Sequence, residues 1–138
     1  MRSVARIHNS EGQHTAEVSA GRHTASISIA SKLSGFGSSV SGGELLMLAL
    51  ATCFCNDIYR EALDMNIEVV SVDVECSGDF PAEGAPATSV KYTAEITARA
   101  PEEQIRELAA RTDRQAEVQN TVRAAIPVGM VEVEPHSV

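Results

Sequence analysis

The feature that most constrains this chain is the run from residue 44 to 65, which contains neither glycine nor proline. All of its residues are tolerated in helices, so the run predicts one long helix. Its first half is apolar on every side, which indicates burial all round, and its second half is amphipathic. About three turns are this apolar, too few to cross a bilayer. The sequence therefore predicts a helix in the interior of a soluble protein.

The segments on either side of this helix alternate between apolar and polar residues, as half-buried strands do. Alternation is clear at 67–77 and 90–99, with a turn-rich connection between them that indicates an antiparallel pair. A weaker alternation at 16–20 and 25–29 brackets Gly21-Arg22 and predicts a hairpin. A further weak strand pattern covers residues 4–8.

The last third predicts two helices and a short strand. Pro101 suits a helix first turn, with acidic residues directly after it. A second helix is expected to start at Thr112 or Asp113, where Thr112 and Gln115 fit a capping box, and to end near Ala125. A final strand is expected at 131–133. Together the elements predict an α+β fold in a single domain spanning 1–138.

Charge and composition exclude several classes of partner. The chain has 138 residues, 11 of them basic and 19 acidic, for a net charge of −8. Without a basic stripe, nucleic acids and anionic membranes are poor partners. Aromatic residues make up 4% and tryptophan is absent, so no stacking platform for bases is expected. No secretion signal is evident, and we expect a cytoplasmic protein.

Cys53 is the first candidate for chemistry. It lies midway along the predicted helix, on a face continued by Asn56, Asp57 and Arg60. A thiol leading into a polar stripe is compatible with a reactive site, provided that a positive neighbour lowers its pKa. Arg60 is two helical turns away, about 10 Å along the axis, and would have to reach back. The alternative is that Cys53 is a small buried apolar residue.

The other two cysteines give weaker signals. Cys55 is two residues from Cys53, and residues at that spacing do not face each other on a helix. Cys76 lies on the apolar face of a predicted strand and is expected in the core.

No cofactor or metal ion is predicted. The four histidines lack helical ligand spacing, and there is no Cys-x-x-Cys motif. Gly35-x-Gly37 lacks the third glycine and preceding strand of a phosphate loop. Asp113, Arg114 and Glu117 are interpreted as a solvated helix face.

The helix carries a recognisable pattern. Gly43-Glu44-Leu45-Leu46 through Ala49-Leu50-Ala51-Thr52-Cys53-Phe54 resembles the central helix of the OsmC/Ohr family of osmotically inducible and organic hydroperoxide resistance proteins. The resemblance continues into the alternating strand that follows the helix. It also covers the segment from Thr112 to Arg123 and the segment Ile126-Pro127-Val128. It implies an α+β fold with antiparallel sheets around the long helix, in an intertwined homodimer. The expected dimer would account for a helix that is apolar all round.

The family's peroxidases use two cysteines, as the resemblance implies. The first attacks the hydroperoxide and becomes a sulfenic acid, and the second closes a disulfide that a dithiol reopens. Cys53 matches the first cysteine, whereas Ile126 stands at the position of the second. The family's glutamate precedes the reactive cysteine by ten residues, where this chain has Gly43; Glu44 is one position off. Arg22 is the candidate for the family's N-terminal arginine.

Three hypotheses follow. In the first, the chain reduces organic hydroperoxides through Cys53 with an external thiol, or with Cys55 or Cys76 as substitute, and Arg60, Asp57 or Tyr59 replaces the missing ion pair. In the second, it is a non-enzymatic dimer that binds a small apolar ligand, and Cys53 is structural. In the third, it is a structural dimer without small-molecule chemistry.

Overall fold

The computed structural model describes residues 1–136 and 138 and divides the chain into two compact units, Met1–Leu46 and Met47–Val138. The element order is three strands, a long helix, two strands and two shorter helices. The prediction of an α+β fold with antiparallel sheets is confirmed. None of the described helices is long and apolar enough to cross a membrane.

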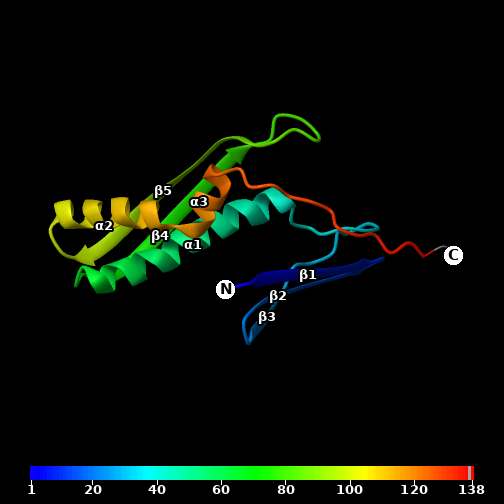
Figure 1. Ribbon diagram of the computed structural model, residues 1–138, viewed down its shortest axis with the longest axis horizontal. Coiled ribbons are helices and arrows are strands. Elements are labelled where there is room, and N and C mark those ends of the chain that lie inside the picture. The colour runs from blue at the N-terminus through cyan, green and yellow to red at the C-terminus, as the bar shows by residue number, and fades with distance from the viewer. Residues whose placement is uncertain (137) are drawn as a thin grey trace. The chain divides into compact units, whose positions relative to one another are not determined.

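The first unit is built on an antiparallel sheet in the order β1-β2-β3 (Figure 1). Its strands are β1 (Ser3–Ser10), β2 (Gln13–Ala20) and β3 (His23–Ile27). Ala20 pairs with His23, so the β2–β3 turn consists of Gly21 and Arg22, as predicted. Gly21 has a φ of 57°, a conformation that glycine adopts without steric cost.

The long helix α1 (Gly42–Asp64) is defined by signals at both ends. At its start, the Glu44 amide donates to Ser41 Oγ at 3.1 Å and the Ser41 amide donates to Glu44 Oε2 at 2.8 Å. This reciprocal pair is a capping box, which satisfies amides that a helix start leaves free. At its end, Asn66 adopts a φ of 56° and the Ile67 amide donates to the Ala62 carbonyl at 2.9 Å, which terminates the helix.

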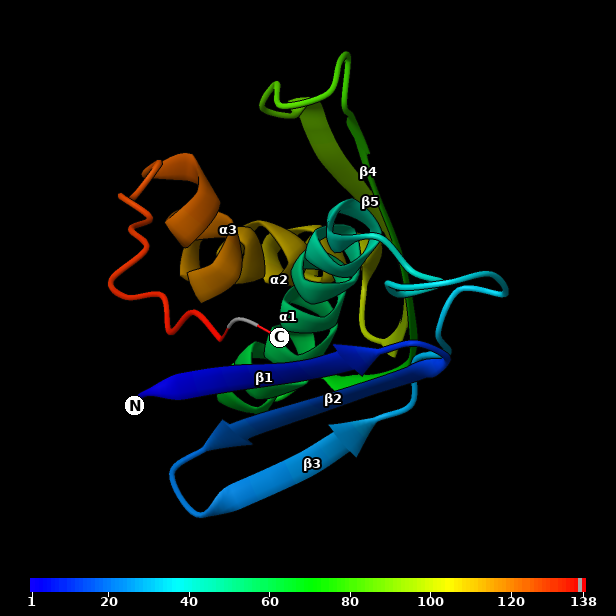
Figure 2. The ribbon, with the colours of Figure 1, turned by 90° about the vertical axis from the view of Figure 1, so that its right-hand side faces the viewer.

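In the second unit, α1 and α2 (Glu102–Gln115) cover one face of the antiparallel hairpin formed by β4 (Glu68–Asp79) and β5 (Thr88–Arg99) (Figure 2). The core residues are spaced four apart on α1 and meet Leu108 of α2. The buried core cluster comprises Phe54, Ile58, Ala62, Ile67 and Leu108. The ring of Phe54 also packs against Tyr92 of β5, with centroids 5.0 Å apart.

Two predictions about strands are wrong. The alternation at 67–77 places Val70, Val72, Val74 and Cys76 on one apolar face. A register shift between Val69 and Ser71 instead leaves Val70 56% exposed and packs Val69 against the core. Residues 131–133, which were expected to form a strand, are described by the structure as exposed and without regular secondary structure.

The predicted boundary between the last two helices is also wrong. Thr112 does not start a helix: it is fully buried within α2, and its hydroxyl donates to the Leu108 carbonyl at 2.8 Å. The break falls at Ala116, whose extended backbone (φ −67°, ψ 109°) separates α2 from α3 (Glu117–Arg123). As a result, Glu117 begins a new helix rather than continuing the exposed face of α2.

Some large apolar side chains of α1 are exposed within the second unit. Leu48 is 59% exposed and Leu63 is 81% exposed, while Leu50, Phe54 and Ile58 are buried. Burial of the remaining apolar side chains by a second copy of the chain stays a prediction.

Candidate functional site

The candidate site lies in the second unit, where α3 approaches the middle of α1. Cys53 is half-buried there. Its Sγ lies 3.5 Å from Asp57 Oδ2, one turn along α1, and 4.0 Å from Glu117 Oε2 at the start of α3. The sulfur is therefore not enclosed by aliphatic side chains alone, but contacts two carboxylates.

Arg60 joins these two carboxylates to each other. Its Nη1 lies 3.0 Å from Asp57 Oδ1 and 3.4 Å from Glu117 Oε1. Its Nε lies 3.3 Å from Glu61 Oε1, and Glu61 also accepts a 2.6 Å hydrogen bond from Arg111. Arg60 therefore contacts Asp57 and Glu117, which contact the thiol, and not the thiol itself. This agrees with its position two helical turns beyond Cys53.

Burial and the carboxylates raise the pKa of Cys53. Loss of hydration is the largest cause, the charges of Asp57 and Glu117 act in the same direction, and the Val118 amide opposes them. The thiol is therefore harder to ionise than a free cysteine, contrary to the requirement for a strongly activated nucleophile.

The two carboxylates themselves differ in proton affinity. The pKa of Asp57 is raised by burial and by the charge of Glu117, although Arg60 opposes the rise. The pKa of Glu117 is lowered, chiefly by its own backbone amide and also by Arg60, despite some loss of hydration. When a site separates two carboxyl groups in this way, the group with the higher pKa is suited to move a proton near neutral pH. In this site that group is Asp57.

The thiol and the two carboxylates are also close enough to consider a metal ion, since their ligand atoms all lie within 4.8 Å of one another. Arg60, however, already pairs with both carboxylates and neutralises part of their charge. We therefore assign Cys53, Asp57 and Glu117 to a hydrogen-bonded ion-pair network.

Gln119 fixes the position of α3 against α1. Its side chain is 3% exposed, and Nε2 donates to the Leu50 carbonyl at 2.9 Å. A second anchor joins the end of α3 to α2 and β5, where Asp113 accepts hydrogen bonds from Arg123 (2.6 Å) and Tyr92. Asp113 was predicted on a solvated face, and its side chain is indeed 41% exposed; what the sequence did not show is that the break at Ala116 folds α3 back so that Arg123 pairs with it.

The other candidate residues are placed elsewhere. Glu44 is engaged in the capping box of α1, and Arg22 lies in the exposed β2–β3 turn of the first unit. Cys55 is half-buried, and Cys76 Sγ lies 3.6 Å from Met47 Sδ. Support of Cys53 by Arg22 or Glu44 stays a prediction.

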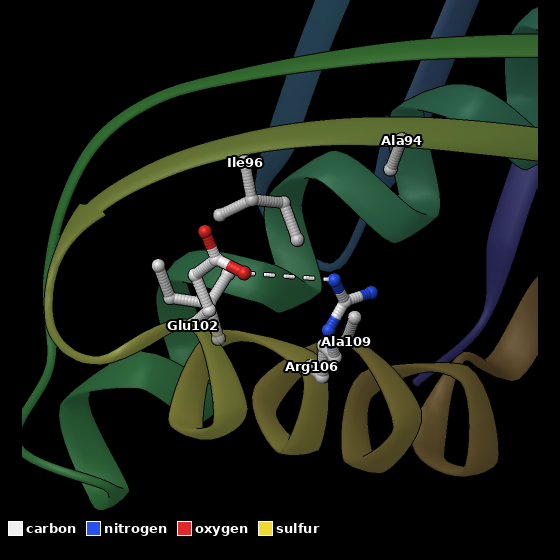
Figure 3. Close-up of a pocket in the computed structure, with 6 residues that line it drawn as sticks. Ala94, Ile96, Glu102, Arg106 and Ala109 are labelled. Carbon is white, nitrogen blue, oxygen red and sulfur yellow. Dashed lines mark ion pairs between the residues drawn. The ribbon is translucent and has the colours of Figure 1, made fainter.

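Among the cavities of the second unit, two lie against both β5 and α2. One, of about 380 Å³, lies between β5 and α2, with Ala94, Ile96 and Ala109 on its walls and the Glu102–Arg106 ion pair (3.7 Å) beside them (Figure 3). Another, of about 470 Å³, has an apolar wall that includes Phe54 and is also lined by Lys91 and by the Arg123–Asp113 ion pair. Cys53 lines neither cavity.

Comparison with known proteins accords with this architecture. A sequence model of OsmC-like proteins matches residues 35–131, more than half of the chain. The chain therefore belongs to the family of OsmC-like proteins. No curated protein is similar enough to the chain to count as a match.

Solved structures with the same fold come from several bacteria. An OsmC-like protein from Mycoplasma pneumoniae superposes with a TM-score of 0.61 at 16% identity, over 88% of this chain and 86% of the other. OhrB of Bacillus subtilis, an organic hydroperoxide resistance protein, gives 0.54 at 15% identity, over 89% and 91%. An organic hydroperoxide resistance protein from Legionella pneumophila gives 0.54 at 18% identity, over 89% and 90%. At these identities the likeness is one of fold.

Proposed function

We propose that the chain reduces organic hydroperoxides, with Cys53 as the nucleophile and an external thiol as the reductant. The observation that carries this proposal is the contact of Cys53 Sγ with the Asp57 carboxylate at 3.5 Å, since a nucleophile with an adjacent base is the arrangement that thiol chemistry requires. Membership of the OsmC-like family, and the organic hydroperoxide resistance proteins among its structural neighbours, support the choice of substrate.

In the first half-reaction, Asp57 accepts the proton of the Cys53 thiol as the sulfur attacks the terminal oxygen of the hydroperoxide. An S–O bond forms and the O–O bond breaks. The departing alkoxide takes the proton back from Asp57 and leaves as an alcohol, and Cys53 becomes a sulfenic acid. The raised pKa of Asp57 makes its carboxylate a stronger base, which suits it to accept the thiol proton.

In the second half-reaction, an external thiol attacks the sulfenic acid. A mixed disulfide forms and water leaves. A second external thiol then releases the small disulfide and restores the Cys53 thiol. External thiols are needed because Ile126 has no thiol and because Cys55, two residues along the same helix, cannot face Cys53. Cys76 contacts Met47, six residues or about 9 Å before Cys53 along α1.

We also propose that the chain acts as a homodimer, as the family resemblance implies. The exposed Leu48 and Leu63 of α1 support this proposal, because apolar side chains of this size gain about 1.5–3 kcal/mol each on full burial.

The test is consumption of cumene hydroperoxide with dithiothreitol, combined with mass spectrometry of a sulfenic-acid trap on Cys53. Turnover is expected in the natural chain and in Cys55→Ser and Cys76→Ser, which serve as matched controls. Cys53→Ser should be folded and inactive. Turnover that survives Cys53→Ser, or a folded natural chain that leaves the hydroperoxide untouched, would remove the proposal.

A second candidate is binding of a small amphipathic molecule without catalysis. The cavity of about 470 Å³ beside Phe54 favours it, since apolar walls with a few polar groups are typical of ligand sites. Inactivity towards hydroperoxides, together with saturable binding of such a molecule, would support this alternative.

A further inference from the structure

The charges around Cys53 bear on which molecules can react with it. Asp57 and Glu117 each contribute one negative charge and Arg60 one positive charge, so the groups nearest the sulfur sum to −1 when ionised. The next turn of α1 adds two carboxylates, Glu61 and Asp64, against the single guanidinium of Arg111. The chain as a whole carries −8, so the distant charges act in the same direction.

The charged groups differ in how far they face solvent. The Asp57 side chain is 8% exposed, whereas Glu117 is 70% exposed and Arg60 48% exposed. A molecule approaching the sulfur from solvent therefore meets Glu117 and Arg60 before Asp57. Because partly solvated charges still act over about 8–10 Å at moderate salt, both groups influence a charged reactant before it touches Cys53.

We infer that Cys53 selects cationic and neutral thiol reductants over anionic ones, with Glu117 and Arg60 as the specificity-determining residues. This inference rests on the proposed role of Cys53 as a reactive thiol. It names the chemistry of the co-substrate in the second half-reaction: a small thiol with an amine or a hydroxyl near the sulfur, rather than a carboxylate.

The same selection operates in thiol–disulfide exchange, which can be measured without any hydroperoxide. The Cys53 thiolate attacks one sulfur of a small disulfide, a new S–S bond forms, and the other half leaves as a thiolate. Three disulfides of similar size make a charge series: cystamine (cationic), bis(2-hydroxyethyl) disulfide (neutral) and 3,3′-dithiodipropionate (anionic). Each rate is divided by the rate of the same disulfide with a neutral cysteine derivative, which removes differences in intrinsic reactivity.

The expected order of normalised rates is cystamine, then the neutral disulfide, then the anionic one. A unit charge about 6 Å from a net charge of −1 changes the rate by roughly threefold at the dielectric of water and roughly tenfold at half that value. The rates of the cationic and anionic probes should therefore differ at least about tenfold at low salt, and most of this difference should disappear near 1 M salt.

Two substitutions assign the effect to named residues. Glu117→Gln should reduce the ratio between cationic and anionic probes to near one, and Arg60→Gln should increase it. Glu103→Gln is the matched control, because it removes one carboxylate from α2 far from the thiol. Glu103 lies beside Met65, and Met65 is twelve residues, or about 18 Å along the axis of α1, from Cys53. This substitution should leave the ratio unchanged. All variants are compared in Cys55→Ser/Cys76→Ser chains, so that only Cys53 reacts.

The outcomes separate this inference from the proposed function. If the disulfides react in the expected charge order but no hydroperoxide is consumed, the inference about selectivity is supported and the proposed peroxidase activity is refuted. Turnover without a charge order, or with a preference for the anionic disulfide, would overturn the inference and leave the peroxidase. Failure of Cys53 in the folded chain to react with any of the three disulfides would reject both.

Discussion

Replacement of Asp57 by asparagine is expected to make Cys53 easier to alkylate and, at the same time, a much poorer reductant of hydroperoxides. Asp57 has two effects on the thiol across the 3.5 Å contact. As a negative charge, it disfavours the thiolate and helps to raise the pKa of Cys53. As a base, it accepts the thiol proton in the proposed reaction. Asparagine has a similar shape but neither the charge nor the basicity.

The size of the first effect follows from the geometry. Two unit charges 3.5 Å apart interact by about 1.2 kcal/mol at the dielectric of water and by about 4.7 kcal/mol at an effective dielectric of 20. Arg60, 3.0 Å from the same carboxylate, cancels much of its field, so the lower value applies. It corresponds to roughly eightfold more thiolate at a fixed pH. A thiolate that forms more easily is about 2.5-fold less nucleophilic, which leaves a net gain of about threefold in alkylation.

The second effect is larger and has the opposite sign. Loss of a positioned general base costs about a hundredfold or more in rate. Alkylation by neutral iodoacetamide, followed by peptide mass spectrometry, measures the first effect, and cumene hydroperoxide consumption measures the second. Asp64→Asn is the matched control, because it lies seven residues further along α1 with a 65% exposed side chain. A parallel rise of both rates in Asp57→Asn would show that Asp57 acts only as a charge and would refute its role as a base.

Three further predictions test the pH dependence, the ion-pair network and the dimer. Because burial and the neighbouring carboxylates raise the pKa of Cys53, alkylation should keep rising with pH beyond the point where a free cysteine levels off, and a plateau at neutral pH would contradict this. Glu61→Gln should lower the free energy of unfolding in urea by about 1.5–3 kcal/mol, because Glu61 is buried and accepts a 2.6 Å hydrogen bond from Arg111, whereas Arg99→Gln, in an exposed pair, should change it little. Burial raises the pKa of Glu61, but its two arginine partners outweigh burial and lower it, so this stabilisation is present above the ordinary carboxyl pKa and should be lost as the pH falls through the lowered value. Leu48→Glu should convert the proposed dimer to monomer in light scattering, and a natural chain that is monomeric at all accessible concentrations would contradict the dimer.

The periodic parts of the fold could be predicted from the sequence because their signals are local. The uninterrupted run at 44–65 predicted α1, and alternation predicted the β4–β5 pair. The break between α2 and α3 was missed for a physical reason: Thr112 and Gln115 have capping-box spacing, but Thr112 is needed in the core, where its hydroxyl bonds within the helix. Nothing in the composition around Ala116 marks it as the residue with an extended backbone.

The residues that α1 contributes to the candidate site could be predicted from the sequence, whereas the contribution of α3 could not. Asp57 and Arg60 follow Cys53 at four and seven residues, spacings that place them on one helix face in any sequence. Glu117 is 64 residues from Cys53 in sequence, and its contact depends on the break at Ala116 and on the hydrogen bond from Gln119 to α1. A buried glutamine two residues after an acidic residue is too weak a signal to have located it.

Two features of this chain are mutually consistent under the proposed chemistry: Ile126 in place of the family's second cysteine, and carboxylates that disfavour the thiolate of Cys53. Ile126 stands where the family resemblance places the second cysteine, so a sulfenic acid on Cys53 has no thiol on that segment to protect it. A permanently ionised Cys53 would be oxidised to the sulfenic acid more readily, and an unprotected sulfenic acid is open to further oxidation that is irreversible in most proteins. Carboxylates that keep the thiol protonated at rest reduce this loss, while Asp57 in contact with the sulfur removes the proton only as a hydroperoxide reacts. The cost is a slower first step at neutral pH, and in return Cys53 can be restored by external thiols alone.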